Sequence, residues 1–106
     1  MERKYESALI LQSGLAEETQ KEILQKIAKK IENLNGKLIS EQLWLKEKDF
    51  CYSIRSRGAV KKKYFKGNYW LMQFVLDTSK LNEIKETIRL EDRILRSLII
   101  RKEEDI

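Results

Sequence analysis

The chain has 106 residues, of which 42% are hydrophobic and 37% charged, and this composition predicts one globular domain over residues 1–106. It contains no histidine and one cysteine, Cys51, which argues against a zinc site, a histidine-based catalytic pair and an internal disulfide. No apolar run is long enough to cross a bilayer and the N-terminus lacks the features of a signal peptide, so we expect no membrane partner, while the net charge of +5 suggests an anionic one.

The first two predicted elements are a strand and a helix. Side chains alternate between two faces from Lys4 to Leu11, and both faces become apolar towards the end, as in a central strand. From Glu17 to Leu34 apolar residues recur three and four positions apart, which predicts an amphipathic helix. Asn35 and Gly36 end this helix, and Gly36 is suited to a left-handed backbone conformation.

A long hairpin with a cationic tip is predicted next. Its first strand covers Lys37–Leu45, where imperfect alternation allows a bulge, and resumes over Phe50–Ile54. The segment Arg55–Lys66 contains no acid, and Tyr64 and Phe65 stand among its cations. This pattern favours contact with RNA or DNA phosphates over a loop that only confers solubility. The cations are Arg55, Arg57, Lys61, Lys62, Lys63 and Lys66.

The remaining elements complete a known arrangement. A strand is predicted over Asn68–Leu76, a helix from Leu81 to near Leu90, and a last strand over Ile94–Arg101. The order β-α-β-β-α-β is the split βαβ, or ferredoxin-like, pattern, an α+β fold with a four-stranded antiparallel sheet in the order 4-1-3-2 and both helices on one face. On the third strand the side chains expected in the core are Trp70, Met72, Phe74 and Leu76.

One face of the predicted sheet is not covered by helices, yet it is apolar. An exposed apolar patch usually marks a partner surface, so we expect a protein to dock there. The residues on this face are Ala8, Ile10, Tyr69, Leu71, Val75, Leu98 and Ile100, with Lys4 and Arg96 at the margin.

An RNA-recognition motif is an alternative interpretation of the third predicted strand. The segment Lys66–Phe74 partly matches the strand that carries the aromatic signature of an RNA-recognition motif. Asn68 and Trp70 do not fit the pattern, and Tyr5 points to the wrong face for base stacking. A free-standing RNA-binding module of this type is therefore an alternative function.

An enzyme is a weaker alternative. An acylphosphatase-like hydrolase on this fold needs an arginine in the turn after the first strand and an asparagine on the second. The turn Gln12–Leu15 contains no arginine, and the second strand has no asparagine. We expect no catalytic activity, no cofactor and no small-molecule substrate, and we expect Cys51 to be a small core or half-buried residue rather than a reactive thiol.

Several segments together carry a resemblance to a known family. They are Arg3–Glu6 before an apolar strand, Asn35-Gly36 at a helix end, Trp44 on the second strand, Phe50–Ile54, Asn68–Met72 and Leu90–Leu98. In these segments the chain resembles the bacterial small-subunit ribosomal protein number six family, over residues 3 to about 102. It departs from the family in the acids of Lys46–Asp49, where basic residues are usual, and in a longer segment from Arg55 to Lys66.

The resemblance implies a structural role in the ribosome. It implies binding to the central domain of small-subunit ribosomal RNA together with small-subunit ribosomal protein number eighteen. It also implies that Arg3, Lys4 and Arg96 lie on the RNA side, and that the protein is ribosome-bound in the cytoplasm or in an organelle. The cations of Arg55–Lys66 are added to this set from charge density alone.

Overall fold

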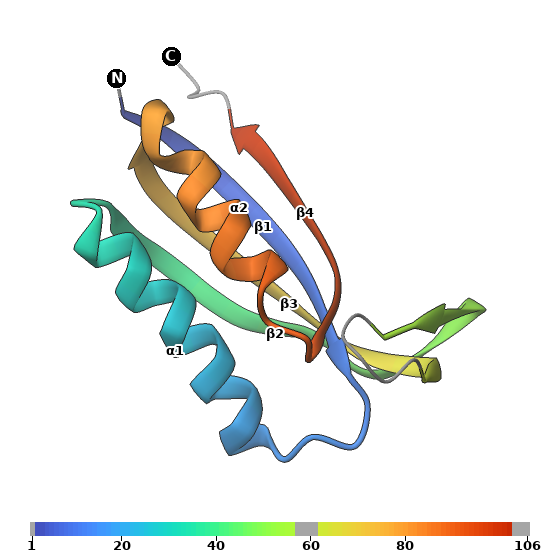
Figure 1. Cartoon of the computed structure of the whole chain (residues 1–106). Helices are drawn as coiled ribbons and strands as arrows, with labels where there is room; N and C mark the ends of the chain where they lie inside the picture. The colour runs from blue at the N-terminus through green and yellow to red at the C-terminus, as the bar shows by residue number, and fades with distance from the viewer. Residues whose placement is uncertain (1, 57–61, 103–106) are drawn as a thin grey trace.

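The computed structural model describes residues 2–56 and 62–102, so Arg57 and Lys61 of the predicted cationic tip lie outside the described residues. The elements are β1 (Glu2–Gln12), α1 (Glu17–Asn33), β2 (Lys37–Arg55), β3 (Lys63–Asp77), a short 3-10 helix η1 (Thr78–Lys80), α2 (Leu81–Arg89) and β4 (Ile94–Lys102). Their order confirms the predicted β-α-β-β-α-β pattern (Figure 1).

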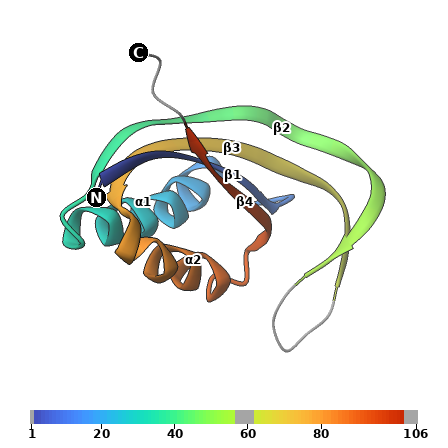
Figure 2. The same cartoon turned by 90° about the horizontal axis from the view of Figure 1, so that it is seen from above.

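The four strands form one antiparallel sheet in the order β2-β3-β1-β4, which confirms the predicted strand order and the ferredoxin-like α+β fold. The sheet is arched, and Figure 2 shows both helices packed against its concave side. No helix of the described chain covers the convex side. The fold therefore exposes one complete sheet face, as the sequence predicts.

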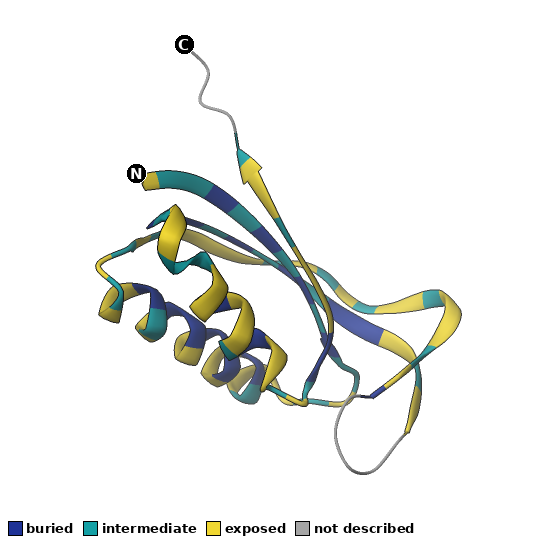
Figure 3. Cartoon of the chain, turned by 45° about the horizontal axis from the view of Figure 1, so that its top comes forward, coloured by how far each residue is buried: buried dark blue, intermediate teal, exposed yellow. Residues whose placement is uncertain are grey.

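The core lies between the two helices and the concave side of the sheet, and the inward residues predicted for β3 are all buried there. Figure 3 shows buried positions alternating with less buried ones along β1 and β3. Burying one large apolar side chain contributes roughly 1.5–3 kcal/mol, so these residues hold the helices on the sheet. The largest fully buried side chains are Phe74, Leu9, Leu11, Ile23, Leu24, Ile27, Ile31, Met72, Leu76, Ile84, Ile88 and Ile94.

Two polar contacts position α1. The buried Gln20 side chain accepts a hydrogen bond from the Trp70 indole at 2.8 Å and donates one to the Leu15 carbonyl at 2.9 Å. A buried amide without such partners would cost about 1–3 kcal/mol. Gln20 therefore fixes the start of the helix against the centre of β3.

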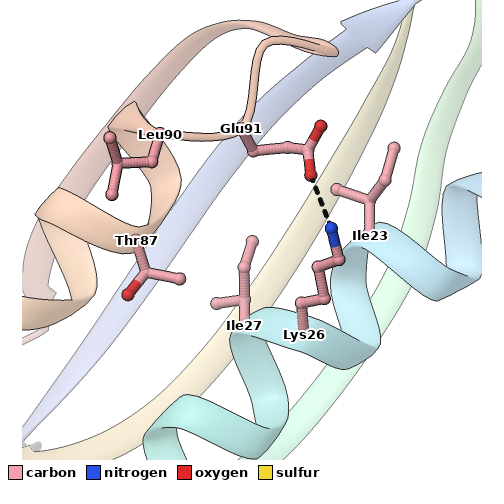
Figure 4. Close-up of a pocket in the computed structure, with 6 residues that line it drawn as sticks. All are labelled: Ile23, Lys26, Ile27, Thr87, Leu90 and Glu91. Atoms are coloured by element: carbon pink, nitrogen blue, oxygen red, sulfur yellow. Dashed lines mark hydrogen bonds and ion pairs between the residues drawn. The ribbon is translucent and has the colours of Figure 1, made fainter.

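An ionic cluster joins α1 to the end of α2. The Glu91 carboxylate lies 3.2 Å from the Lys26 ammonium and accepts a 2.7 Å hydrogen bond from the Arg93 guanidinium. That bond to Arg93 lowers the pKa of Glu91 to about 2. Figure 4 shows the hollow beside the cluster, of about 140 Å³, which is lined by Ile23, Lys26, Ile27, Thr87, Leu90 and Glu91.

The turn between α1 and β2 differs from the prediction. Asn35, not Gly36, has the left-handed conformation, with φ of 64°. Gly36 is needed for a different reason: a β-carbon there would lie 2.7 Å from the Val75 carbonyl oxygen and 2.8 Å from the Ile31 side chain. The glycine permits the close approach of the turn to β3.

The hairpin strands are longer than predicted. The first is continuous to Arg55 and the second begins at Lys63, so the segment between them is much shorter than Arg55–Lys66. Pairing between β2 and β3 shifts register at four places; two of them fall within Lys37–Leu45, where a bulge was predicted, and the other two lie beyond it. Cys51 is exposed, so the prediction that it is a core or half-buried residue is wrong.

Candidate functional site

Strand pairing brings the predicted apolar residues together on the convex side of the sheet. Ala8 lies opposite Leu71 on one side and Leu98 on the other, and Ile10 lies opposite Tyr69. Residues directly opposite in a ladder share a face. We call this set of residues the open sheet face: Ala8, Ile10, Tyr69, Leu71, Val75, Leu98 and Ile100.

Exposure of the open sheet face rises towards β4. Leu98 and Ile100 are 63% and 44% exposed, whereas the members on β1 and β3 are half-buried by their neighbours. Leu98 and Ile100 stand on the edge strand, which pairs with β1 alone among the described strands. The hydrogen-bonded pair Glu6 and Gln73 interrupts the face between Leu71 and Val75, so its larger apolar part is centred on Ala8, Leu71 and Leu98, and a second chain could cover it.

Three aromatic rings extend this surface towards β2. The Tyr69 ring meets Trp44 edge-on at 6.1 Å and Phe50 at 6.2 Å between centroids. Trp44 is 55% exposed. Sequence reasoning placed neither Trp44 nor Phe50 on the face because the bulges of β2 change which side each residue faces. Large aromatic residues in an irregular strand were the available clue.

The predicted cations at the sheet margin do not all share one side. Lys4 lies opposite Val75 and Arg96 opposite Ile10, so both flank the open sheet face. Arg3 lies opposite the buried Leu76, which puts it on the helix side, with its Nε buried. Arg3 is therefore separated from the other two.

The far end of the hairpin projects beyond the rest of the sheet. We call residues 48–56 and 62–67 the arm; Figures 1 and 2 show it reaching past the end of β1 and curling towards the helix side. Close to its end, the Ser56 amide donates to the Lys62 carbonyl at 2.7 Å, and the Lys62 amide donates to the Ser56 hydroxyl at 2.9 Å. These two bonds tie the strands together just before the undescribed residues.

The described cations of the arm have different surroundings. Arg55 lies directly opposite Lys63 in the ladder, and like charges in that position repel. The Lys62 ammonium lies 5.4 Å from the centre of the Tyr64 ring, within cation–π range. Lys66 lies 3.9 Å from the Asp49 carboxylate, so an acid distant in sequence approaches the predicted acid-free segment.

The root of the arm is held by Asn68 and Glu47. The Asn68 amide accepts from the Glu47 backbone at 3.0 Å and donates to the Gln12 carbonyl at 3.3 Å and to the Glu47 carboxylate at 3.2 Å. The same carboxylate accepts from the Gly14 amide at 3.0 Å. Glu47 has a positive φ of 46°, so the bulge that bends β2 also connects the arm to the β1–α1 turn. Sequence reasoning missed this role.

The RNA-recognition-motif alternative lacks an accessible stacking residue on β1. Tyr5 is buried and stacked on Phe74 with ring centres 5.7 Å apart, so it cannot stack on a base as an RNA-recognition motif requires. Within residues 2–56 and 62–102, no three or more histidine, cysteine, aspartate or glutamate side chains are grouped to hold a metal ion. None of the described helices is long and apolar enough to span a membrane.

Comparisons with known proteins agree on one family. A family model described as Ribosomal protein S6 matches residues 4–101. Small ribosomal subunit protein bS6 from Clostridium botulinum is 36% identical over 101 residues, covering 95% of this chain and 99% of that protein. The bS6 protein of Dictyoglomus turgidum is 30% identical over 104 residues, covering 96% and 99%. The crystal structure of 30S ribosomal protein S6 from Thermotoga maritima is similar with a TM-score of 0.80 and 27% identity, covering 96% of this chain and 89% of that one.

Proposed function

The chain belongs to the ribosomal protein S6 family of non-enzymatic small-subunit proteins, and on this premise we propose that it binds the central domain of small-subunit ribosomal RNA together with small-subunit ribosomal protein number eighteen. The RNA and the partner protein are held by different surfaces. No covalent step is involved, and the function is binding alone. We expect the protein on ribosomes of the cytoplasm or of an organelle.

The observation that supports pairing with the partner protein is the open sheet face. An apolar surface that includes Leu98 at 63% exposure is costly to leave in water. The cations Lys4 and Arg96 flank this face, whose centre is at Leu71. A partner that covers this centre would bring its own RNA-binding groups next to these two cations, so that both chains hold one RNA surface.

The RNA contacts proposed for this chain lie in two places. Lys4 and Arg96 flank the open sheet face, and Arg55, Lys62, Lys63 and Lys66 lie on the arm. Arg57 and Lys61, outside the described residues, also belong to the proposed set, and so does Arg3, which lies on the helix side of the sheet and apart from both places. Each ammonium or guanidinium that neutralises a phosphate releases counterions, so this binding should weaken as salt rises.

Replacing Leu71 by aspartate tests the docking face. Pairing would bury an unpaired carboxylate, so we expect Leu71→Asp to weaken binding of the partner protein by at least roughly 30-fold. Titration calorimetry with the purified partner measures this loss, and far-UV circular dichroism checks that the variant is folded. A folded Leu71→Asp protein that pairs normally would show that the partner docks elsewhere.

Leu90→Asp is the matched control. Leu90 is 68% exposed at the end of α2, on the helix side of the sheet, so the same substitution there should leave pairing intact. RNA binding is measured with and without the partner in the same series. A large gain in RNA affinity on adding the partner supports the ribosomal role, whereas tight binding of short single strands by the isolated chain favours a free-standing RNA-binding module.

A further inference from the structure

A hollow of about 330 Å³ lies between the arm and the β1–α1 turn. Its walls are Ser13 on one side and five consecutive residues of the arm on the other, Lys62, Lys63, Tyr64, Phe65 and Lys66. Its volume falls at the lower end of the roughly 300–1,000 Å³ of small-ligand sites. The described lining residues are thus three lysines, two aromatic residues and a serine. Because side chains alternate along a strand, Lys63 and Phe65 share one side of β3, and Lys62 lies over the Tyr64 ring on the other.

These groups match the parts of one nucleotide. Ammonium groups are compact point charges suited to a phosphate, and an aromatic ring offers a face on which a base can stack. Phe65 is 65% exposed, so its ring is available for stacking. The Ser13 hydroxyl can donate and accept a hydrogen bond, as recognition of a ribose or a base edge requires.

Charge in the arm also favours an anion here. Lys63 lies directly opposite Arg55 in the ladder, and this pair of like charges is destabilising until a counter-charge approaches. A phosphate bound next to Lys63 would offset the repulsion. Among the residues that the structure describes, none that lines the hollow is acidic.

Both walls of the hollow are held in place by hydrogen bonds. On the arm, Ser56 and Lys62 exchange two bonds of 2.7 and 2.9 Å. On the turn, the Gly14 amide next to Ser13 donates to the Glu47 carboxylate at the root of the arm. A site that is ordered before its ligand arrives loses less entropy on binding.

We propose that this hollow captures a single unstacked nucleotide of an RNA strand, with its base against Phe65 and its phosphate on Lys63. This inference rests on the proposed function and deepens it, because it assigns the arm to an unpaired base rather than to the backbone of a duplex. A base flipped out of a bulge or loop exposes both its faces and its edge to such a site.

The test uses two RNA hairpins that differ in one base. One carries a single bulged adenosine, and the other carries an abasic ribose at that position, so both keep the same phosphates. Fluorescence anisotropy at low salt should show that the wild-type protein binds the first roughly 10-fold more tightly. Phe65→Ala should remove this preference, whereas Lys63→Gln should weaken the binding of both RNAs by a similar factor.

Tyr52→Ala is the matched control, because Tyr52 is 85% exposed on the arm but does not line the hollow. This variant should keep the wild-type preference. Equal affinity of the wild-type protein for the two hairpins, no binding to either, or a preference that survives in Phe65→Ala would each overturn the inference. Pairing with the partner protein is measured separately through Leu71, so failure of the hollow is distinguishable from failure of the proposed function.

Discussion

Asn68 and Glu91 are the residues whose roles depend most on contacts far away in sequence. Asn68 makes three hydrogen bonds, to Glu47 twice and to Gln12, although it is only a mismatch when its segment is compared with an RNA-recognition motif. Glu91 unites Lys26 and Arg93 in one cluster. The contacts of Asn68 and the contact of Glu91 with Lys26 cannot be inferred from local sequence, because they are completed by groups on other elements, whereas Arg93 lies only two residues from Glu91.

Glu91 should make stability depend on pH. Its pKa is lowered from 4.5 in the unfolded chain to about 2, so it stabilises the folded state above about pH 4.5 and loses this effect as pH falls towards 2. Because Lys26 and Arg93 are partly exposed, we expect a contribution of about 1–2 kcal/mol at neutral pH. The free energies of unfolding of the wild type and Glu91→Gln, measured in urea, should differ by this amount at pH 7. The difference should shrink as the pH falls from about 4.5 towards 2.

The comparison variant for this measurement is Glu86→Gln. Glu86 pairs with Arg89 on the exposed surface of α2, where solvent screens the interaction. Its loss should change the free energy of unfolding by less at every pH. A Glu91→Gln difference that stays constant from pH 7 down to 2 would show that the carboxylate is not held by Arg93.

At the scale of elements, the close packing of β1, β2 and β3 at the root of the arm depends on Gly67. A β-carbon at Gly67 would lie 2.6 Å from the Phe50 ring, 2.8 Å from the Ile10 side chain and 2.9 Å from the Leu11 carbonyl oxygen. Gly67→Ala should therefore lower the free energy of unfolding by about 1–3 kcal/mol and displace Phe50. Denaturant titration measures the first effect and the Phe50 ring resonances the second.

A substitution at Gln73, a surface position on the same strand, separates the steric effect at Gly67 from general weakening of β3. Gln73→Ala removes only the 3.0 Å hydrogen bond to Glu6 and should cost below about 1 kcal/mol. Equal losses for the two variants would mean that the methyl group is accommodated without displacing its neighbours. The position of Phe50, and with it the aromatic end of the open sheet face, would then not depend on glycine at residue 67.

For the whole molecule, the distribution of charge is the property that sets RNA affinity. The net charge is +5, and the segment Arg55–Lys66 alone carries six cations. Replacing Lys61, Lys62 and Lys63 by glutamine should make the slope of log K against log salt shallower by up to about 3. Filter binding of ribosomal RNA over a series of salt concentrations measures the slope.

A triple variant on the helices provides the control for net charge. Lys21, Lys29 and Lys85 are exposed on α1 and α2, and replacing them by glutamine removes the same total charge from another surface. Affinity should change little and the slope should stay near that of the wild type. Identical slopes in the two triple variants would show that the arm does not touch phosphate.

The sequence by itself was sufficient to predict the order of elements, the strand order and which of the named residues of β1, β3 and β4 lie on each sheet face. The reason is that alternation along a strand and the three-to-four spacing along a helix report which side chains share a face, whatever they contact. Trp70 and Phe74 are therefore buried, and Leu71 and Leu98 lie on the open sheet face, as predicted.

Only the tertiary structure decided how the hairpin is paired. Each bulge in β2 reverses which side the following residues face, and the position of a bulge depends on the partner strand rather than on local sequence. For this reason Trp44 joins Tyr69, Asp49 approaches Lys66, and Ser13 comes to face the arm. The candidate nucleotide site is made by contacts between distant segments, and periodicity within one segment carries no information about them.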